Sequence, residues 1–438
     1  MIISFLKDLD IDEDRTTFYR YKGAIYFDIY LPYVKQHCPE CGNDRVYKNG
    51  TYIRVITHSA STFEPIFLNL HIQKFVCSNC KYKFEQKQKI CPKNLSISTP
   101  TIILILEKLT NPSTTFTSVA SDLFLSKQNV IDIFDRYIDY KRLPLSEHLS
   151  FDEKYTGGNM VDNYAFVIQD WKENKIIDIY PTRKKAKLEK YFRLIPLEER
   201  LRVKTISIDM WETYLELSKR FFPNAIIAID SFHVIENINR VMNKVRVKIM
   251  NKFDNGAEDL DDNDIYYYML KKFAHYFVSE FDNLSDTRKI PKMKTKWAKQ
   301  EILKYLLDID PVLKECYQLV CDYREFNRSE LSNFSENDLD ELIERFYKCS
   351  SLEFRKIGKM LSIWKKEILN SLITINDCYT VSNKKDEIPR LRRLSNGPIE
   401  GINSILEKIL SNGNGYTNFK RFRNRAMLCV NKTFVFRQ

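Results

Sequence analysis

Three acidic residues that are far apart in the sequence have the surroundings of metal ligands. Asp152 lies in a predicted strand, Asp209 ends another predicted strand, and Glu400 stands in the first turn of a predicted helix. Carboxylate oxygens are hard ligands that suit Mg²⁺ or Mn²⁺. Two such ions can activate a nucleophilic oxygen and stabilise the leaving oxygen when a phosphodiester is displaced. The three acids therefore predict a centre with two divalent ions.

Other reactive side chains lie near these positions. Glu153 adjoins the first acid but would point to the opposite face of the strand. Asp230 ends the next predicted strand and is an alternative to Asp209 as the second ligand. His233 either contacts the scissile phosphate or is a structural histidine. Trp211 either stacks on an unpaired base or packs in the core.

Two Cys-x-x-Cys pairs predict a structural zinc site within a region of short strands. Their cysteines are Cys38, Cys41, Cys77 and Cys80. Two residues between cysteines let both thiolates of one turn face one ion, and two such turns complete a tetrahedral site. The 35 residues between the pairs are rich in β-formers, which predicts a zinc-ribbon-like hairpin around one Zn²⁺. His37 and Cys91 are nearby, but a closed site needs neither.

Basic residues are concentrated in two parts of the chain, whose net charge is +11. Residues 31–98 and residues 384–425 each hold ten Lys/Arg against four Asp/Glu. This distribution favours a polyanion such as double-stranded DNA, although a lysine-rich surface can also merely keep a protein in solution. The basic residues that we expect to contact DNA are Lys83, Lys87, Lys89, Lys420, Arg421, Arg423 and Arg425.

Residues 115–138 predict two helices joined by a tight turn. Val119, Ala120 and Leu123 would face the core, and Ser126 would cap the second helix. A recognition helix presents its first residues to base edges. These residues are Lys127, Gln128 and Asn129. We therefore expect a DNA-binding helix-turn-helix, for which an ordinary small helical bundle is the alternative.

The middle of the chain predicts the sheet that would position the acids. Strands are expected at residues 148–155, 163–171, 175–182, 203–211 and 224–230, with helices near 186–195 and 212–222. This order is typical of a ribonuclease-H-like sheet, in which the first and fourth strands are neighbours. Asp152 and Asp209 would then meet at one edge of the sheet.

The expected architecture is multidomain α/β, with a ribonuclease-H-like catalytic core interrupted by a large all-helical insertion. Its parts are a zinc-binding ribbon-like domain at 1–95, a helix-turn-helix domain at 96–145, the first part of the core at 146–234 and the insertion at 235–380. Residues 381–438 would complete the core, with a polar linker (382–396), the helix of Glu400 and a basic C-terminal tail. A hydrophobic content of 44% supports packed domains. The N-terminus does not predict a signal peptide, and the apolar run at 101–109 is too short for a membrane span, so we expect a cytoplasmic protein. In the cytoplasm, ten cysteines favour metal ligands or free thiols over disulfides.

Five segments together carry a family resemblance. They are FDE at 151–153, IDMWETY at 208–214, FPNAIIAIDSFHVIENINRVMNKVR at 222–246, SNGPIEGIN at 395–403 and GYTNFKRFRNR at 415–425. Nearly the whole chain resembles the DDE transposases of bacterial insertion sequences, specifically the ISL-three family. The string from residue 206 to residue 246 is the most specific part of this resemblance.

The resemblance implies a function. Asp152, Asp209 and Glu400 fall on the family's catalytic triad. The implied reaction is Mg²⁺-dependent cleavage at terminal inverted repeats, followed by transfer of the 3′-hydroxyls into target DNA. Such a reaction on the bacterial nucleoid implies a homodimer or higher homo-oligomer on paired ends.

The chain departs from the family pattern after SNGPIEGIN, where Glu407, Leu410 and Ser411 stand in place of basic residues. Two other functions fit part of the sequence. One is a catalytically inactive, transposon-derived protein that binds specific DNA sequences. The other is a ribonuclease-H-like nuclease that cuts DNA without joining it.

Overall fold

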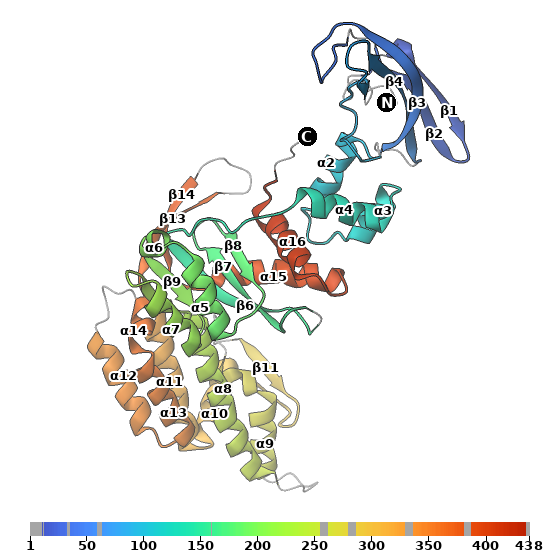
Figure 1. Cartoon of the computed structure of the whole chain (residues 1–438). Helices are drawn as coiled ribbons and strands as arrows, with labels where there is room; N and C mark the ends of the chain where they lie inside the picture. The colour runs from blue at the N-terminus through green and yellow to red at the C-terminus, as the bar shows by residue number, and fades with distance from the viewer. Residues whose placement is uncertain are drawn as a thin grey trace. The chain divides into compact units, whose positions relative to one another are not determined.

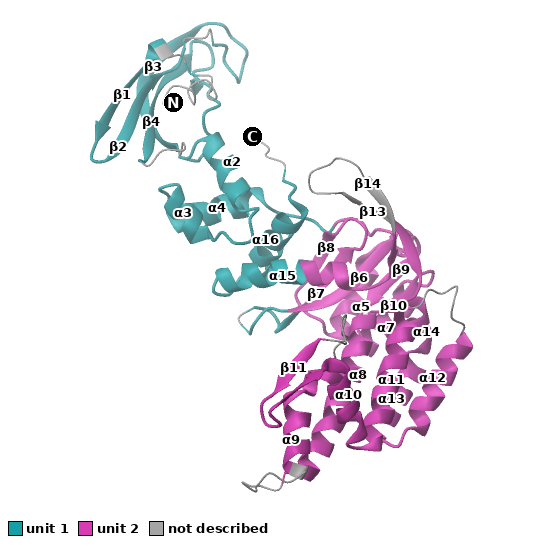
Figure 2. Ribbon diagram, turned by 180° about the vertical axis from the view of Figure 1, so that it is seen from behind, with its two compact units in different colours: residues 1–142, 155–164, 402–438 teal, residues 143–154, 165–401 magenta. Residues whose placement is uncertain are grey.

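The computed structural model describes residue 11 and residues 13–32, 36–58, 64–158, 160–254, 262–278, 286–328, 336–380 and 387–434. By its internal contacts the chain forms two compact units (Figure 2). Unit 1 comprises residues 1–142, 155–164 and 402–438, and unit 2 comprises residues 143–154 and 165–401. The predictions for the N-terminal residues 1–10 and for the start of the linker, 382–386, lie outside the described residues. In the part of the chain that is described, no helix is long and apolar enough to cross a membrane.

Unit 1 begins with a five-stranded sheet (Figure 1). Its elements are η1 (Glu13–Arg15), β1 (Thr16–Tyr21), β2 (Ala24–Tyr30), β3 (Val46–His58), β4 (Ile66–Cys77) and β5 (Lys83–Glu85). The strand order is β1-β2-β4-β3, with β5 beside β4, and only β2 and β4 pair in parallel. Alternating residues of β4, such as Leu68 and Leu70, are buried with β2 in one core. Strands β3 and β4 are longer than the sequence predicts, because β-forming residues run from one cysteine pair to the other.

Helices complete unit 1. They are α2 (Thr99–Lys108), α3 (Phe116–Asp122), α4 (Lys127–Tyr137), residues 402–412 of α15 (Gly397–Asn412) and α16 (Phe419–Asn431). Thr115 and Ser118 cap α3 reciprocally, and the Ser126 hydroxyl caps α4 by accepting from the backbone N–H of Asn129. Leu428 of α16 shares a hydrophobic core with α2, α3 and α4. The C-terminal helix thus packs on the helices that follow the N-terminal sheet, a contact that the sequence did not predict.

Unit 2 is built on a second five-stranded sheet. Its strands are β6 (His148–Tyr155), β7 (Tyr164–Asp170), β8 (Lys175–Tyr180), β9 (Thr205–Ile208) and β10 (Ile226–Ile229), and the helices between them are α5 (Lys185–Leu194), α6 (Leu197–Leu201) and α7 (Glu212–Phe221). The order is β10-β9-β6-β7-β8, with β9 parallel to both β6 and β10 and with β7 antiparallel to β8. Phe192 of α5 and Tyr214 of α7 share a core with Phe151 of β6. All five predicted strands and both predicted helices are observed here.

A block of helices follows the sheet (Figure 1). Its elements are α8 (Ser231–Met250), η2 (Asn251–Phe253), α9 (Asp262–Lys272), η3 (Ala274–Phe277), α10 (Lys299–Asp308), α11 (Pro311–Arg328), α12 (Glu336–Lys348), α13 (Leu352–Ile363) and α14 (Lys365–Asn370). The prediction that residues 235–380 are entirely helical is wrong, because β11 (Thr287–Ile290) and β12 (Thr295–Ala298) form a hairpin within them. The strands of this hairpin are mostly exposed and show no apolar alternation that would reveal them. A second hairpin, β13 (Thr374–Thr380) with β14 (Glu387–Arg393), replaces part of the expected linker.

Candidate active site

The parallel pairing of β6 with β9 brings two acids together. Phe151 is paired with Ile208, and the next residues along the chain are Asp152 and Asp209. Since side chains alternate along a strand, Phe151 and Ile208 enter the core while the two acids leave on the other face. Burial, followed by the charge of Asp209, raises the pKa of Asp152 from 3.8 to about 8. A divalent cation would compensate this disfavoured charge, so the pair is a suitable place for one.

Two donors hold the same oxygen of Asp209. The side-chain amide of Asn396 donates to Oδ1 at 2.7 Å, and Nε2 of His233 lies 3.0 Å from the same atom. The hydrogen bond to Asp209 raises the pKa of His233 to about 9. The other ring nitrogen of His233 is 3.6 Å from a carboxylate oxygen of Glu236. The protonated ring of His233 and the side-chain amide of Asn396 therefore hold the carboxylate of Asp209 in place.

The remaining acids surround this pair unequally. Asp230 caps α8 by accepting from the backbone N–H of Phe232 at 3.2 Å, and it is 2% exposed. Ligand atoms of Asp209, Asp230 and His233 lie within 4.8 Å of one another. Glu400 is outside that group, exposed in the first turn of α15. Burial and the charges of Asp209 and Glu400 raise the pKa of Asp230, so the acids act on one another electrostatically.

A pocket of about 350 Å³ opens beside Asp209. In it, the guanidinium of Arg183 lies 5.2 Å from the ring centroid of Trp211 and forms an ion pair with Glu153. The indole also meets the ring of Tyr214 edge-on at 4.5 Å. These contacts favour the packing role for Trp211. No sequence signal indicated Arg183, whereas Asn396 stood in the SNG motif without an assigned role.

The sulfur atoms of the four predicted cysteines converge in unit 1. The Sγ–Sγ distance is 3.5 Å between Cys38 and Cys80 and 3.6 Å between Cys41 and Cys77, and all four sulfurs lie within 4.8 Å of one another. Zinc–sulfur bonds of about 2.3 Å in a tetrahedron separate the sulfurs by about 3.8 Å, so the cluster fits a zinc ion. His37 pairs with Asp44 and Cys91 bonds to Gln88, so neither belongs to the cluster.

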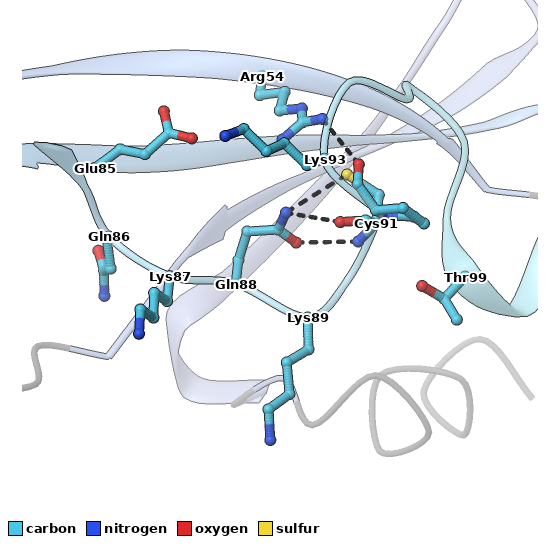
Figure 3. A pocket seen from close by; sticks show the side chains of 10 residues that line it. Arg54, Glu85, Gln86, Lys87, Gln88, Lys89, Cys91, Lys93 and Thr99 are labelled. Carbon is cyan, nitrogen blue, oxygen red and sulfur yellow. Dashed lines mark hydrogen bonds between the residues drawn. The ribbon is translucent and has the colours of Figure 1, made fainter. Parts of the chain in front are cut away.

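The basic residues after the second cysteine pair are exposed. These residues are Lys83, Lys87 and Lys89. Two of them line a pocket of about 530 Å³, and Figure 3 shows the side chains of Lys87 and Lys89 extending to the same side, away from Arg54. Arg54 itself donates to the backbone carbonyls of Pro92 and Leu95, at 3.3 and 2.7 Å. The lysines are thus available to a partner, while Arg54 holds the chain that follows β5.

The start of α4 is also exposed. Lys127, Gln128 and Asn129 all face solvent in its first turn, and the amide of Gln128 donates to Asp132 at 2.6 Å. Val119, Ala120 and Leu123 are buried, as the sequence predicts. The three polar side chains can therefore reach a surface placed against this helix end.

Each of the C-terminal basic residues has a partner within unit 1. Arg425 is 1% exposed and donates to the carbonyls of Asn111 and Thr114, each at 2.9 Å, so burial contradicts the prediction that it contacts DNA. The other three are paired: Lys420 with Asp139, Arg421 with Asp135 and Arg423 with the carbonyl of Tyr140. On α15, Leu410 is buried, which accounts for one of the departures from a basic helix face.

Two family models match the chain. A family model described as transposase, DDE_Tnp_ISL3, matches residues 149–380 and 374–426. A second model, described as the zinc-finger of transposase IS204/IS1001/IS1096/IS1165, matches residues 35–80. The search of curated proteins gave no match. Because the first match spans most of the chain and the second contains the four-cysteine cluster, the chain belongs to the ISL3 family of DDE transposases.

Proposed function

We propose that this transposase cleaves DNA at the terminal inverted repeats of an insertion sequence and joins the freed 3′-hydroxyls to target DNA. Asp152, Asp209 and Glu400 would hold two Mg²⁺ or Mn²⁺ ions. The observation that carries the proposal is the pairing of β6 with β9, because it sets two acids from distant parts of the chain side by side. The raised pKa of Asp152 supports it, since a cation would stabilise this carboxylate.

The order of strands supports a ribonuclease-H-like core. The strand with the first acid, β6, is central, with β9 and β10 on one side and β7 and β8 on the other. In this interpretation residues 146–234 and residues 381–401 form the core, whereas residues 402–438, which the sequence assigns to the core, belong to unit 1. The helical block is an insertion before Glu400.

The ions would activate the nucleophilic oxygen and stabilise the leaving oxygen of an in-line displacement. The protein must hold the acids rigidly and keep the scissile phosphate in line with the attacking oxygen. His233, with its raised pKa, adds positive charge beside the acids, where a phosphate would approach. Glu400 is the exposed ligand, on a helix that enters the site from the far end of the sequence.

Unit 1 supplies the proposed DNA-binding modules. Helices α3 and α4 would act as a helix-turn-helix, whose exposed first turn reads base edges. The proposed base readers are Lys127, Gln128 and Asn129. The proposed phosphate contacts are Lys83, Lys87, Lys89, Lys420, Arg421 and Arg423. Since an element has two ends, two or more copies of the chain would act on a paired complex.

Cleavage and joining are tested with oligonucleotides that carry the ends of the encoding element. We expect Mg²⁺-dependent cleavage at the element boundary and, with pre-cleaved ends, covalent joining to target DNA. Cleavage without joining would indicate a nuclease. Binding of the ends without cleavage in either metal would indicate an inactive DNA-binding protein.

A further inference from the structure

Asn396 is one of the most deeply buried polar residues of unit 2. It is 1% exposed and directly precedes α15, four residues before Glu400. The preceding residue is also anchored, because the indole N–H of Trp171 donates to the carbonyl of Ser395 at 3.0 Å. A buried amide in such a fixed turn needs a function, since an apolar residue would be cheaper to bury there.

The side chain of Asn396 faces two acceptors. Its Nδ2 donates to Oδ1 of Asp209 at 2.7 Å and to the carbonyl of Phe151 at 3.3 Å. Both partners can only accept, so the nitrogen of the amide must lie toward them. Among the described residues the amide oxygen of Asn396 has no hydrogen-bond partner although it is buried, and the hydrogen bonds of the amide nitrogen have to offset this free-energy cost.

The contact with Asp209 is selective for one oxygen. Each carboxylate oxygen has about two acceptor positions. Oδ1 of Asp209 already receives Asn396 at 2.7 Å and His233 at 3.0 Å. These two donors occupy the acceptor positions of Oδ1, so Asp209 would hold a metal ion through Oδ2.

The main chain of Asn396 extends the same control to the other acids. Its carbonyl accepts from the backbone N–H groups of Ile399 and Glu400, at 3.0 and 3.2 Å, and so begins the helix that carries the third acid. Its side chain meanwhile holds the carbonyl of Phe151, the residue before Asp152. Asn396 therefore contacts the side chain of Asp209, the backbone next to Asp152 and the backbone of Glu400.

We propose that Asn396 is a positioning residue of the catalytic centre. It fixes the orientation of Asp209 toward the metal ion and sets the start of the Glu400 helix against β6. This inference rests on the proposed function of the three acids. Residues that orient a metal ligand in this way typically change metal affinity by about 10–100-fold when they are replaced.

The test measures Mn²⁺ binding to the full-length protein by the electron paramagnetic resonance signal of free Mn²⁺. Asn396→Leu keeps the side-chain volume without a donor, and Asn396→Ala provides a second variant should the first fold poorly. We expect both to raise the Mn²⁺ dissociation constant about 10–100-fold. The Mg²⁺ concentration for half-maximal cleavage should rise with it, while affinity for terminal DNA stays unchanged.

Asn370→Leu is the matched control. Asn370 also donates to a strand of this sheet, to the carbonyl of Ile227 at 2.8 Å, and its described contacts include no acid. The Asn370→Leu variant should have a lower melting temperature than the wild type and the same affinity for Mn²⁺. If Asn370→Leu weakens Mn²⁺ binding as much as Asn396→Leu, the role of Asn396 is only structural and the inference is wrong.

Asp209→Asn separates this inference from the proposed function. If Asp209→Asn binds Mn²⁺ as tightly as the wild type, the metal site itself is misplaced. If Asp209→Asn loses binding while both Asn396 variants keep it, the metal site stands and the positioning role of Asn396 is overturned.

Discussion

Replacing Asp152 with Asn should stabilise the metal-free protein while removing its response to Mg²⁺. Burial, and next the charge of Asp209, raises the pKa of Asp152 from 3.8 to about 8 in the folded protein. A raised carboxyl pKa means that folding disfavours the charged form. The penalty is absent below a pH of about 4, grows as pH rises, and is complete above a pH of about 8. At about 1.36 kcal/mol per pKa unit, it amounts to roughly 4 kcal/mol at neutral pH.

Asn keeps the size of the side chain and can donate to Asp209, so the variant should escape most of this penalty. Differential scanning calorimetry in EDTA should place the transition of unit 2 at a higher temperature in Asp152→Asn, by a larger margin at pH 8 than at pH 5. Adding Mg²⁺ at about 100 times its dissociation constant should stabilise the wild type by roughly 2.7 kcal/mol and leave the variant unchanged. If the variant melts below the wild type in EDTA at pH 8, burial does not penalise the charge of Asp152. If Mg²⁺ stabilises the variant as much as the wild type, Asp152 does not bind the ion.

Four other predictions concern the remaining residues. Cleavage in gel assays should be abolished, while terminal DNA still binds, in Asp152→Asn, Asp209→Asn and Glu400→Gln. Activity should remain in the control variants Asp230→Asn and Glu153→Gln. An inactive Asp230→Asn together with an active Asp209→Asn would make Asp230 the second ligand. Elemental analysis should find one zinc per chain. Cys77→Ser should lose the ion together with the fold of the ribbon, because the binding free energy of a structural zinc is part of the folding free energy. Full folding without zinc would contradict this. Sequence preference should relax by about 1–3 kcal/mol per good base contact when Lys127, Gln128 and Asn129 are replaced by Ala. Binding to all sequences should weaken, and the salt slope should fall by about 0.9 per lost phosphate contact, when Lys83, Lys87 and Lys89 are replaced by Ala. Equal affinity of the wild type for terminal and random DNA would exclude base readout by α4. Arg425→Ala should lower the melting temperature of unit 1, because the carbonyl of Thr114 loses the guanidinium as a donor and the carbonyl of Asn111 keeps only its contacts with Thr114. The salt slope of DNA binding should not change; a lower slope would restore Arg425 as a DNA contact.

The strands of unit 2 could be predicted because successive side chains of a strand point to opposite faces of the sheet, which leaves an alternating pattern in the sequence. In β6, Leu149 and Phe151 enter the core, while Ser150 and Asp152 lie on the other face. The same spacing in β9 puts Ile206 on the side of the core. The partnership of the two acids then followed from the order of elements alone, since the first and fourth strands of this arrangement are neighbours.

Long-range partners could not be predicted in this way. Arg425 lies in a basic string that resembles a DNA contact, but its acceptors are carbonyls at Asn111 and Thr114, more than 300 residues earlier. Local sequence carries no sign of such acceptors. A long cationic side chain in a helix is taken for a surface charge unless the distant carbonyls to which it donates are known.

Asn396 shows how the two kinds of information combine. Asn396 lies one helical turn before Glu400, a spacing that can be seen in the sequence. Its contact with Asp209 spans 187 residues and could not be predicted from the sequence. Because its amide binds Asp209 and its carbonyl begins the helix of Glu400, a change at Asn396 acts on two acids at once. Variants at Asn396 and Asp209 should therefore be strongly non-additive in metal affinity, since the amide has little left to orient once the carboxylate is gone. A double variant whose loss equals the sum of the two single losses would show that Asn396 acts independently of Asp209.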